Sequence, residues 1–96
     1  MTRWFVYIIE CRDGSLYTGI AVDVERRFQQ HIAGKGARYT RSHPPLRLLG
    51  RAELPDRSQA SRAEHAIKQL TAARKRALCA AWSIESAGTT ARPAAG

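Results

Sequence analysis

The sequence predicts an α+β domain, in two layers, in which a three-stranded antiparallel sheet is flanked by helices in the order β-β-α-β-α-α. Two apolar segments separated by an Asp-Gly turn predict a β-hairpin. Two later segments repeat apolar residues at helical spacing, on either side of a third strand-like segment. The chain has 96 residues, the size of one domain. We place that domain at residues 1–85 and expect a disordered tail at 86–96.

The hairpin is expected to pair residues 3–10 with residues 16–21. The first segment is aromatic and β-branched, which is typical of a buried strand. Antiparallel pairing brings Tyr7 and Tyr17 near each other. Which face each ring occupies depends on the register, because a slip of one residue reverses every side chain.

The first helix is expected to begin after Asp23, a favourable N-cap, and to end at Gly34, a typical C-cap residue. Apolar side chains recur every four residues and form its expected buried stripe: Val24, Phe28 and Ile32. Arg27 and His31 lie one turn apart beside this stripe. We therefore expect both to border the core, on the side where a cleft would form.

Residues 34–45 are predicted to be a loop, since glycines and prolines bound a short polar stretch. This segment is basic, has no acidic residue and includes a tyrosine that could stack on a base. The whole chain has 16 Lys and Arg against 8 Asp and Glu, a net charge of +8. Such an excess favours a polyanionic partner, because contacts to phosphates release condensed counterions. A genome-biased, arginine-rich composition is the alternative explanation.

The remaining elements are a third strand at residues 46–54 and two helices, at 59–72 and at 73–82. Asp56 or Ser58 is the expected N-cap of the first of these helices. No apolar stretch approaches the roughly 18–20 residues needed to cross a bilayer, and the N-terminus lacks the pattern of a secretion signal. We therefore expect a cytoplasmic protein without a membrane partner.

Several side chains have the chemistry that phosphodiester hydrolysis needs: a phenol, a guanidinium, an imidazole and a carboxylate. Each also has an ordinary structural explanation. Tyrosines are good strand formers, basic residues on a helix are usually solvated, and Glu64 is spaced to pair with Lys68 one turn later. The candidate catalytic residues are Tyr7, Tyr17, Arg27, His31 and Glu64.

These residues resemble the motifs of the GIY-YIG nuclease superfamily, most closely its small stand-alone bacterial YhbQ-like (UPF0213) members. Tyr7 ends the segment that matches the first motif, in which Phe5 and Val6 stand where glycine and isoleucine are usual. Tyr17 and Gly19 match the first and last residues of the second motif, Gly19 as a structural residue. The resemblance covers nearly the whole predicted domain and implies the same architecture as the order of elements.

The resemblance implies a DNA endonuclease that depends on a divalent metal ion. Arg27 would contact the scissile phosphate, because its planar fork can donate to two oxygens. Tyr17, relayed through His31, would draw the proton from the attacking water. Glu64 would hold one Mg²⁺ or Mn²⁺ ion, since Mg²⁺ is commonly bound by one or two carboxylates with water and substrate phosphate. The expected nucleic-acid contacts are Lys35, Arg38, Tyr39, Arg41 and Lys68.

Larger family members attach this module to domains that choose the substrate. Alone, it is expected to select DNA structure rather than sequence, in repair or recombination. Several relatives carry a late asparagine that braces the active site, and this chain has no asparagine. Either another residue replaces it, or this branch does without it, or activity is weak. The alternatives are a non-catalytic module with the same fold that binds DNA or RNA, and a regulatory subunit whose protein partner supplies specificity.

Overall fold

A computed structural model describes residues 2–90 of the chain. In chain order, the elements are β1 (Trp4–Cys11), β2 (Leu16–Ala21), α1 (Val24–Ile32), α2 (Arg38–Ser42), β3 (Pro45–Leu54), α3 (Arg57–Lys68) and α4 (Ala72–Thr90). The strands form one sheet in the order β2-β1-β3, and β1 is antiparallel to both neighbours. The predicted fold class, a three-stranded antiparallel sheet flanked by helices, is confirmed.

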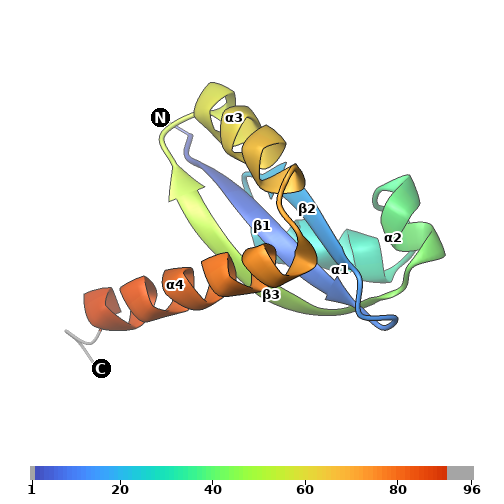
Figure 1. Ribbon diagram of the computed structural model, residues 1–96. Helices are drawn as coiled ribbons and strands as arrows, with labels where there is room; N and C mark the ends of the chain where they lie inside the picture. Colours follow the sequence, from blue (N-terminus) through green and yellow to red (C-terminus); the bar gives the residue numbers. More distant parts are fainter. Residues whose placement is uncertain (1, 91–96) are drawn as a thin grey trace.

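The central strand β1 is covered on both faces (Figure 1). In that view α3 and α4 lie in front of the sheet and α1 lies behind it. Val6 and Ile8 point into the core beneath α3 and α4, whereas Tyr7 and Ile9 point toward α1. Since a strand buried on both faces needs apolar residues at successive positions, the continuous apolar run of β1 follows from its central place.

The hairpin register places both tyrosines on the same face of the sheet. Tyr7 lies opposite Gly19, and Tyr17 lies opposite Ile9. Because side chains alternate along a strand, all four residues face α1. The turn between the strands contains Gly14 with φ of +87°, a conformation that glycine adopts without strain.

The predicted N-caps, Asp23 and Asp56, are confirmed. The Asp23 carboxylate accepts the backbone N–H of Arg26 at 3.0 Å, and Asp56 accepts that of Gln59 at 2.9 Å. The C-cap of α1 is Ala33 rather than the predicted Gly34, which comes one residue later with φ of +79°, the left-handed conformation that ends many helices. The ends of α1 and the start of α3 are therefore set by local chemistry.

The buried face of α1 differs from the predicted one. Ile32, expected in the core, is 52% exposed, whereas His31 is only 1% exposed. Both ring nitrogens of His31 have hydrogen-bond partners, so the polar ring can be buried without losing its hydrogen bonds. The helix is therefore rotated about its axis relative to the apolar stripe, and Val24, Phe28 and His31 face the sheet.

The segment predicted to be a loop contains the short helix α2, so the order of elements is β-β-α-α-β-α-α. Its backbone N–H groups at Arg41 and His43 bond to the carbonyls of Ala37 and Tyr39. A helix this short is held by tertiary contacts rather than by intrinsic propensity. Here the buried side chain of Thr40 supplies one such contact, which local rules do not reveal.

The last helix is longer than predicted. α4 continues to Thr90, so residues 86–90 of the predicted disordered tail are helical, and residues 91–96 lie outside the described residues. Residues 86–90 are Ser-Ala-Gly-Thr-Thr, of which only the alanine is a strong helix former, so local helix propensity does not explain the extension. Figure 1 shows α4 projecting past β3.

Within residues 2–90, the structure contains no helix with the length and apolar character needed to cross a membrane.

Candidate active site

The predicted catalytic residues gather at the side of the sheet where β2 is the edge strand. They come from four elements: Tyr7 on β1, Tyr17 on β2, Arg27 and His31 on α1, and Glu64 on α3. The two tyrosine ring centroids are 6.4 Å apart, and Tyr17 is 5.2 Å from the His31 ring. The charges of Arg27 and Glu64 influence the pKa of both tyrosines, so both residues lie near the phenols.

Tyr7 is buried and packs directly on the backbone of β2. A Cβ atom at Gly19 would lie 2.5 Å from the Tyr7 hydroxyl oxygen, 2.7 Å from its Cζ and 3.0 Å from Cε2 of Tyr17. No real side chain tolerates such contacts. Because position 19 has no side chain, the Tyr7 ring can lie against β2 and reach His31. The Nε2 atom of His31 lies 2.9 Å from the Tyr7 hydroxyl oxygen.

Both phenols are protonated at neutral pH in this state. Burial, assisted by the neighbouring Tyr17, raises the pKa of Tyr7 to about 12, although Arg27 acts in the opposite direction. Burial also raises the pKa of Tyr17; Glu64 adds to this effect, whereas Lys68 and Arg27 oppose it. Tyr17 is only half-buried, so it is the phenol that a water or substrate can reach.

His31 occupies the centre of a hydrogen-bond chain. Its Nε2 contacts the Tyr7 hydroxyl, and its Nδ1 lies 2.6 Å from Oγ1 of Thr40. Burial, followed by the charge of Arg27, lowers the pKa of His31 to about 4, so the ring is neutral at pH 7. The predicted relay from Tyr17 through His31 needs a free ring nitrogen on His31, and here both are engaged: Nε2 by Tyr7 and Nδ1 by Thr40.

Thr40 and Gly36 are parts of this site that sequence analysis missed. The Thr40 side chain is 2% exposed, and its hydroxyl donates to the Ala37 carbonyl at 3.0 Å. A Cβ atom at Gly36 would lie 2.7 Å from Cγ of His31, so the chain passes directly against the imidazole. A hydroxyl residue within a basic segment was the only signal in the sequence, and it is a weak one.

Arg27 lies between α1 and the two phenols. It is half-buried, and its Nη1 donates to Oε1 of Gln30 at 2.9 Å. This hydrogen bond anchors one side of the guanidinium. The rest of the fork faces the tyrosines, where it can donate to the oxygens of a bound phosphate.

Glu64 is the carboxylate of the site and the candidate metal ligand. Its side chain is 24% exposed, and Nζ of Lys68 lies 3.2 Å from Oε2. Among the side chains that the structure describes, those of residues 2–82, no three or more of His, Cys, Asp or Glu form a cluster able to hold a metal ion. One carboxylate fits an Mg²⁺ or Mn²⁺ ion that takes its other ligands from water and from substrate phosphate, so Glu64 could hold such an ion together with the substrate.

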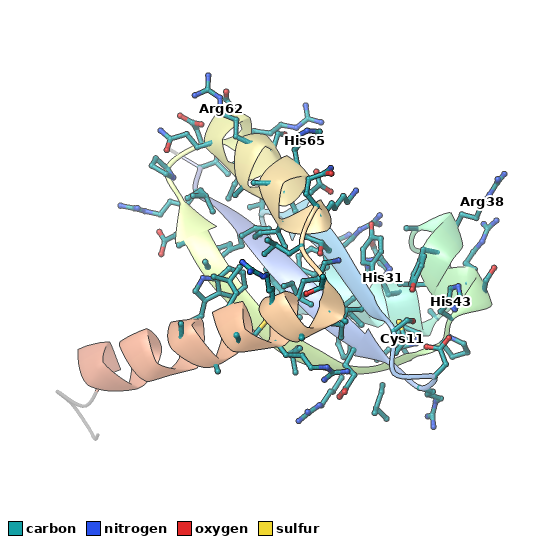
Figure 2. The ribbon with its side chains drawn as sticks, viewed as in Figure 1. Cys11, His31, Arg38, His43, Arg62 and His65 are labelled. Atoms are coloured by element: carbon teal, nitrogen blue, oxygen red, sulfur yellow. The ribbon has the colours of Figure 1, made fainter. Side chains whose placement is uncertain are left out.

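Of the predicted nucleic-acid contacts, Lys68 and Tyr39 adjoin the catalytic residues: Lys68 pairs with Glu64, and Tyr39 packs on Tyr17. The Tyr39 ring stacks on Tyr17, with centroids 5.8 Å apart, and on His43, with centroids 4.1 Å apart. The edge of the His43 ring is held by Asp13, whose carboxylate lies 2.8 Å from Nδ1. The outer residues Lys35, Arg38 and Arg41 are exposed, and Figure 2 shows Arg38 pointing outward from α2.

Comparison with known proteins agrees with this architecture. Residues 3–77 match the family described as the GIY-YIG catalytic domain. The chain is 55% identical over 78 residues to a UPF0213 protein of Cupriavidus pinatubonensis, covering 81% of this chain and 87% of that protein. It is 52% identical over 80 residues to UPF0213 protein YhbQ of Escherichia coli, covering 83% and 80%.

The fold and site thus define a GIY-YIG catalytic domain. A solved structure, protein EF2693 of E. faecalis, is 32% identical and superposes with a TM-score of 0.59, covering 88% of this chain and 90% of that one. The chain therefore belongs to the GIY-YIG family and, within it, to the UPF0213 group.

Proposed function

We propose that this protein is an endonuclease that requires a divalent metal ion and hydrolyses phosphodiester bonds in DNA. The proposal includes selection of substrate structure rather than sequence, and action in repair or recombination in the cytoplasm. It rests above all on one observation: four elements bring Tyr7, Tyr17, Arg27, His31 and Glu64 to the same edge of the sheet. The family match over residues 3–77 supports the same class of activity.

In the proposed reaction, Arg27 binds the scissile phosphate and offsets its charge. Tyr17, the accessible phenol, first loses its own proton to solvent, and the resulting phenolate takes the proton of the attacking water. When bound at Glu64, an Mg²⁺ or Mn²⁺ ion would supply positive charge to the leaving 3′ oxygen. Besides burial, the Glu64 carboxylate raises the pKa of Tyr17, whereas Lys68 and Arg27 lower it. A cation held at Glu64 would offset this carboxylate and lower the pKa of Tyr17, so that a larger fraction of the phenol would be ionised at neutral pH.

A cleavage assay with matched variants tests the proposal. The wild type is incubated with branched, nicked, single-stranded and linear DNA and with RNA, with and without Mg²⁺ or Mn²⁺. Tyr17→Phe and Glu64→Gln are expected to reduce the rate by on the order of 100-fold or more, the usual contribution of a positioned acid or base. Glu53→Gln is the control, because Glu53 lies on β3 and pairs with Arg3 at the surface. Cleavage by Tyr17→Phe at the wild-type rate would contradict the mechanism.

The alternative is a nucleic-acid-binding module without catalysis. The contact between Lys68 and Glu64 favours it, because an ammonium group already neutralises the carboxylate that would hold the ion. This alternative predicts salt-dependent binding of DNA with no metal-dependent products. The same assay separates the two functions, since only the first yields cleaved strands.

A further inference from the structure

A continuous hydrogen-bond chain joins α2, α1 and β1 behind the candidate active site. It runs from the Ala37 carbonyl to the Thr40 hydroxyl, then to Nδ1 and Nε2 of His31, and ends at the Tyr7 hydroxyl. The three side chains are 1–2% exposed. Solvent therefore cannot supply a missing donor or acceptor, so the hydrogen bonds within the chain must be mutually consistent.

The direction of the chain follows from its end on the backbone. A carbonyl can only accept, so the single proton of the Thr40 hydroxyl is given to Ala37. The Thr40 oxygen must then accept from His31, which places the imidazole proton on Nδ1. Since a neutral imidazole carries only one N–H, Nε2 is an acceptor, and Tyr7 donates its O–H to it.

This direction determines what Tyr7 offers to Arg27. With its proton directed at His31, the Tyr7 oxygen presents only lone pairs toward the active site. The guanidinium of Arg27 is a neighbour of that oxygen and has only donors. Reversal of the chain would turn an N–H of His31 toward Tyr7 and free the Tyr7 proton to point at the cation.

We propose that Thr40 is a positioning residue: it fixes His31 as the Nδ1–H tautomer and, through His31 and Tyr7, orients Arg27 toward the phosphate. Gly36 serves the same arrangement, because a side chain at this position would collide with the imidazole of His31. The part of this inference that concerns Arg27 rests on the proposed function.

The tautomer can be measured directly by long-range ¹H–¹⁵N correlation on the labelled full-length chain at pH 7. Signals of His31 are assigned by their absence in His31→Gln. We expect Nδ1–H in the wild type and in Thr40→Ser, which keeps the hydroxyl. In the isosteric Thr40→Val, the Nε2–H form is expected to become the major one. An Nε2–H wild type, or a Thr40→Val spectrum equal to that of the wild type, would overturn the proposal.

Cleavage supplies the second readout. Thr40→Val is expected to lower kcat/KM on the order of 10–100-fold, as supporting residues around a site typically do, and Thr40→Ser is expected to restore most of the rate. A changed tautomer with wild-type cleavage would overturn the positioning of Arg27. If the wild type cuts no substrate, the proposed function fails, and the spectra still decide whether Thr40 controls His31.

Discussion

At the scale of single residues, the space at Gly19 decides whether Tyr7 can reach His31. We predict that Gly19→Ala lowers the free energy of unfolding by about 1–3 kcal/mol, as overpacking of a well-filled core usually does. The reason is that the new Cβ would meet the Tyr7 ring at 2.5–2.7 Å. Urea unfolding followed by circular dichroism measures the loss.

Gly50→Ala is the matched control for this prediction. Its Cβ would lie 3.1 Å from the side chain of Cys79 and 3.3 Å from Trp82, contacts that small shifts can relieve. We expect a smaller loss than at Gly19. An equal decrease in the free energy of unfolding in the two variants would contradict the prediction that the close contact between Gly19 and Tyr7 makes position 19 the more sensitive one.

The buried imidazole of His31 predicts a pH dependence of stability. Its pKa is lowered from 6.5 to about 4 in the folded chain, so between these values the unfolded chain binds more protons. Stability is therefore expected to fall as pH decreases from 6.5 to 4. The shift corresponds to roughly 3 kcal/mol.

The measurement is the difference between the wild type and His31→Gln in free energy of unfolding, from pH 7.5 to pH 4. Carboxylates with a lowered pKa, such as Glu10 and Asp13, also weaken the fold in acid, but they act alike in both proteins and cancel. Parallel curves for the two proteins would mean that His31 is not held neutral in the fold.

At the scale of elements, α2 is expected to deliver basic side chains to the DNA backbone. Arg38→Ala is predicted to weaken the binding of every DNA sequence similarly. The slope of the logarithm of the binding constant against the logarithm of the salt concentration is expected to become smaller by about 1, as for one lost phosphate contact. The matched control is Arg62→Ala, because Figure 2 shows Arg62 on α3 at a separate part of the molecule. Fluorescence anisotropy at several salt concentrations, with metal omitted, checks this. An equal effect of both variants would indicate diffuse electrostatic attraction.

The elements also show which features local sequence could predict. The hairpin and the caps at Asp23 and Asp56 follow from short-range chemistry and are confirmed, whereas α3 spans Arg57–Lys68 rather than the predicted residues 59–72. The helix α2 and the burial of His31 depend on one another, because Thr40 folds onto a ring distant in sequence. Neither residue carries that information by itself.

The candidate site could be predicted only in part, for a similar reason. Motif resemblance indicated Tyr7, Tyr17, Arg27 and Glu64, and the fold brings them together. The hydrogen-bond partner of His31 could not be predicted, since it depends on the hairpin register and on the rotation of α1. Both are decided by packing across the sheet rather than by spacing along the chain.

At the scale of the whole molecule, each of the two cysteines can serve as a probe of unfolding for the core on one face of the sheet. Cys11 belongs to the core beneath α1 and Cys79 to the core beneath α3 and α4, and both thiols are free and buried. Burial raises the pKa of Cys79 to about 11 and also raises that of Cys11. Because the thiolate is the reactive form, both are protected in the folded protein.

We predict that a thiol reagent modifies both cysteines at one rate, the rate of global unfolding, in the full-length protein. Cys11→Ser and Cys79→Ser variants allow each thiol to be followed alone by mass spectrometry. Much faster modification of Cys79 would contradict the prediction and would mean that α4 leaves the sheet while the α1 layer stays folded.

The hydrogen-bond chain behind Tyr7 ends on the main-chain oxygen of Ala37. A point mutation replaces a side chain and leaves the backbone carbonyl in place. The carbonyl that fixes the direction of these hydrogen bonds therefore remains after any single substitution. The direction of the hydrogen bonds can therefore be changed by substitution at position 40. Only serine or threonine can both accept and donate a hydrogen bond there through one small hydroxyl. Anyone redesigning this surface for a new substrate could thus vary Arg38 widely while leaving its second neighbour, Thr40, untouched.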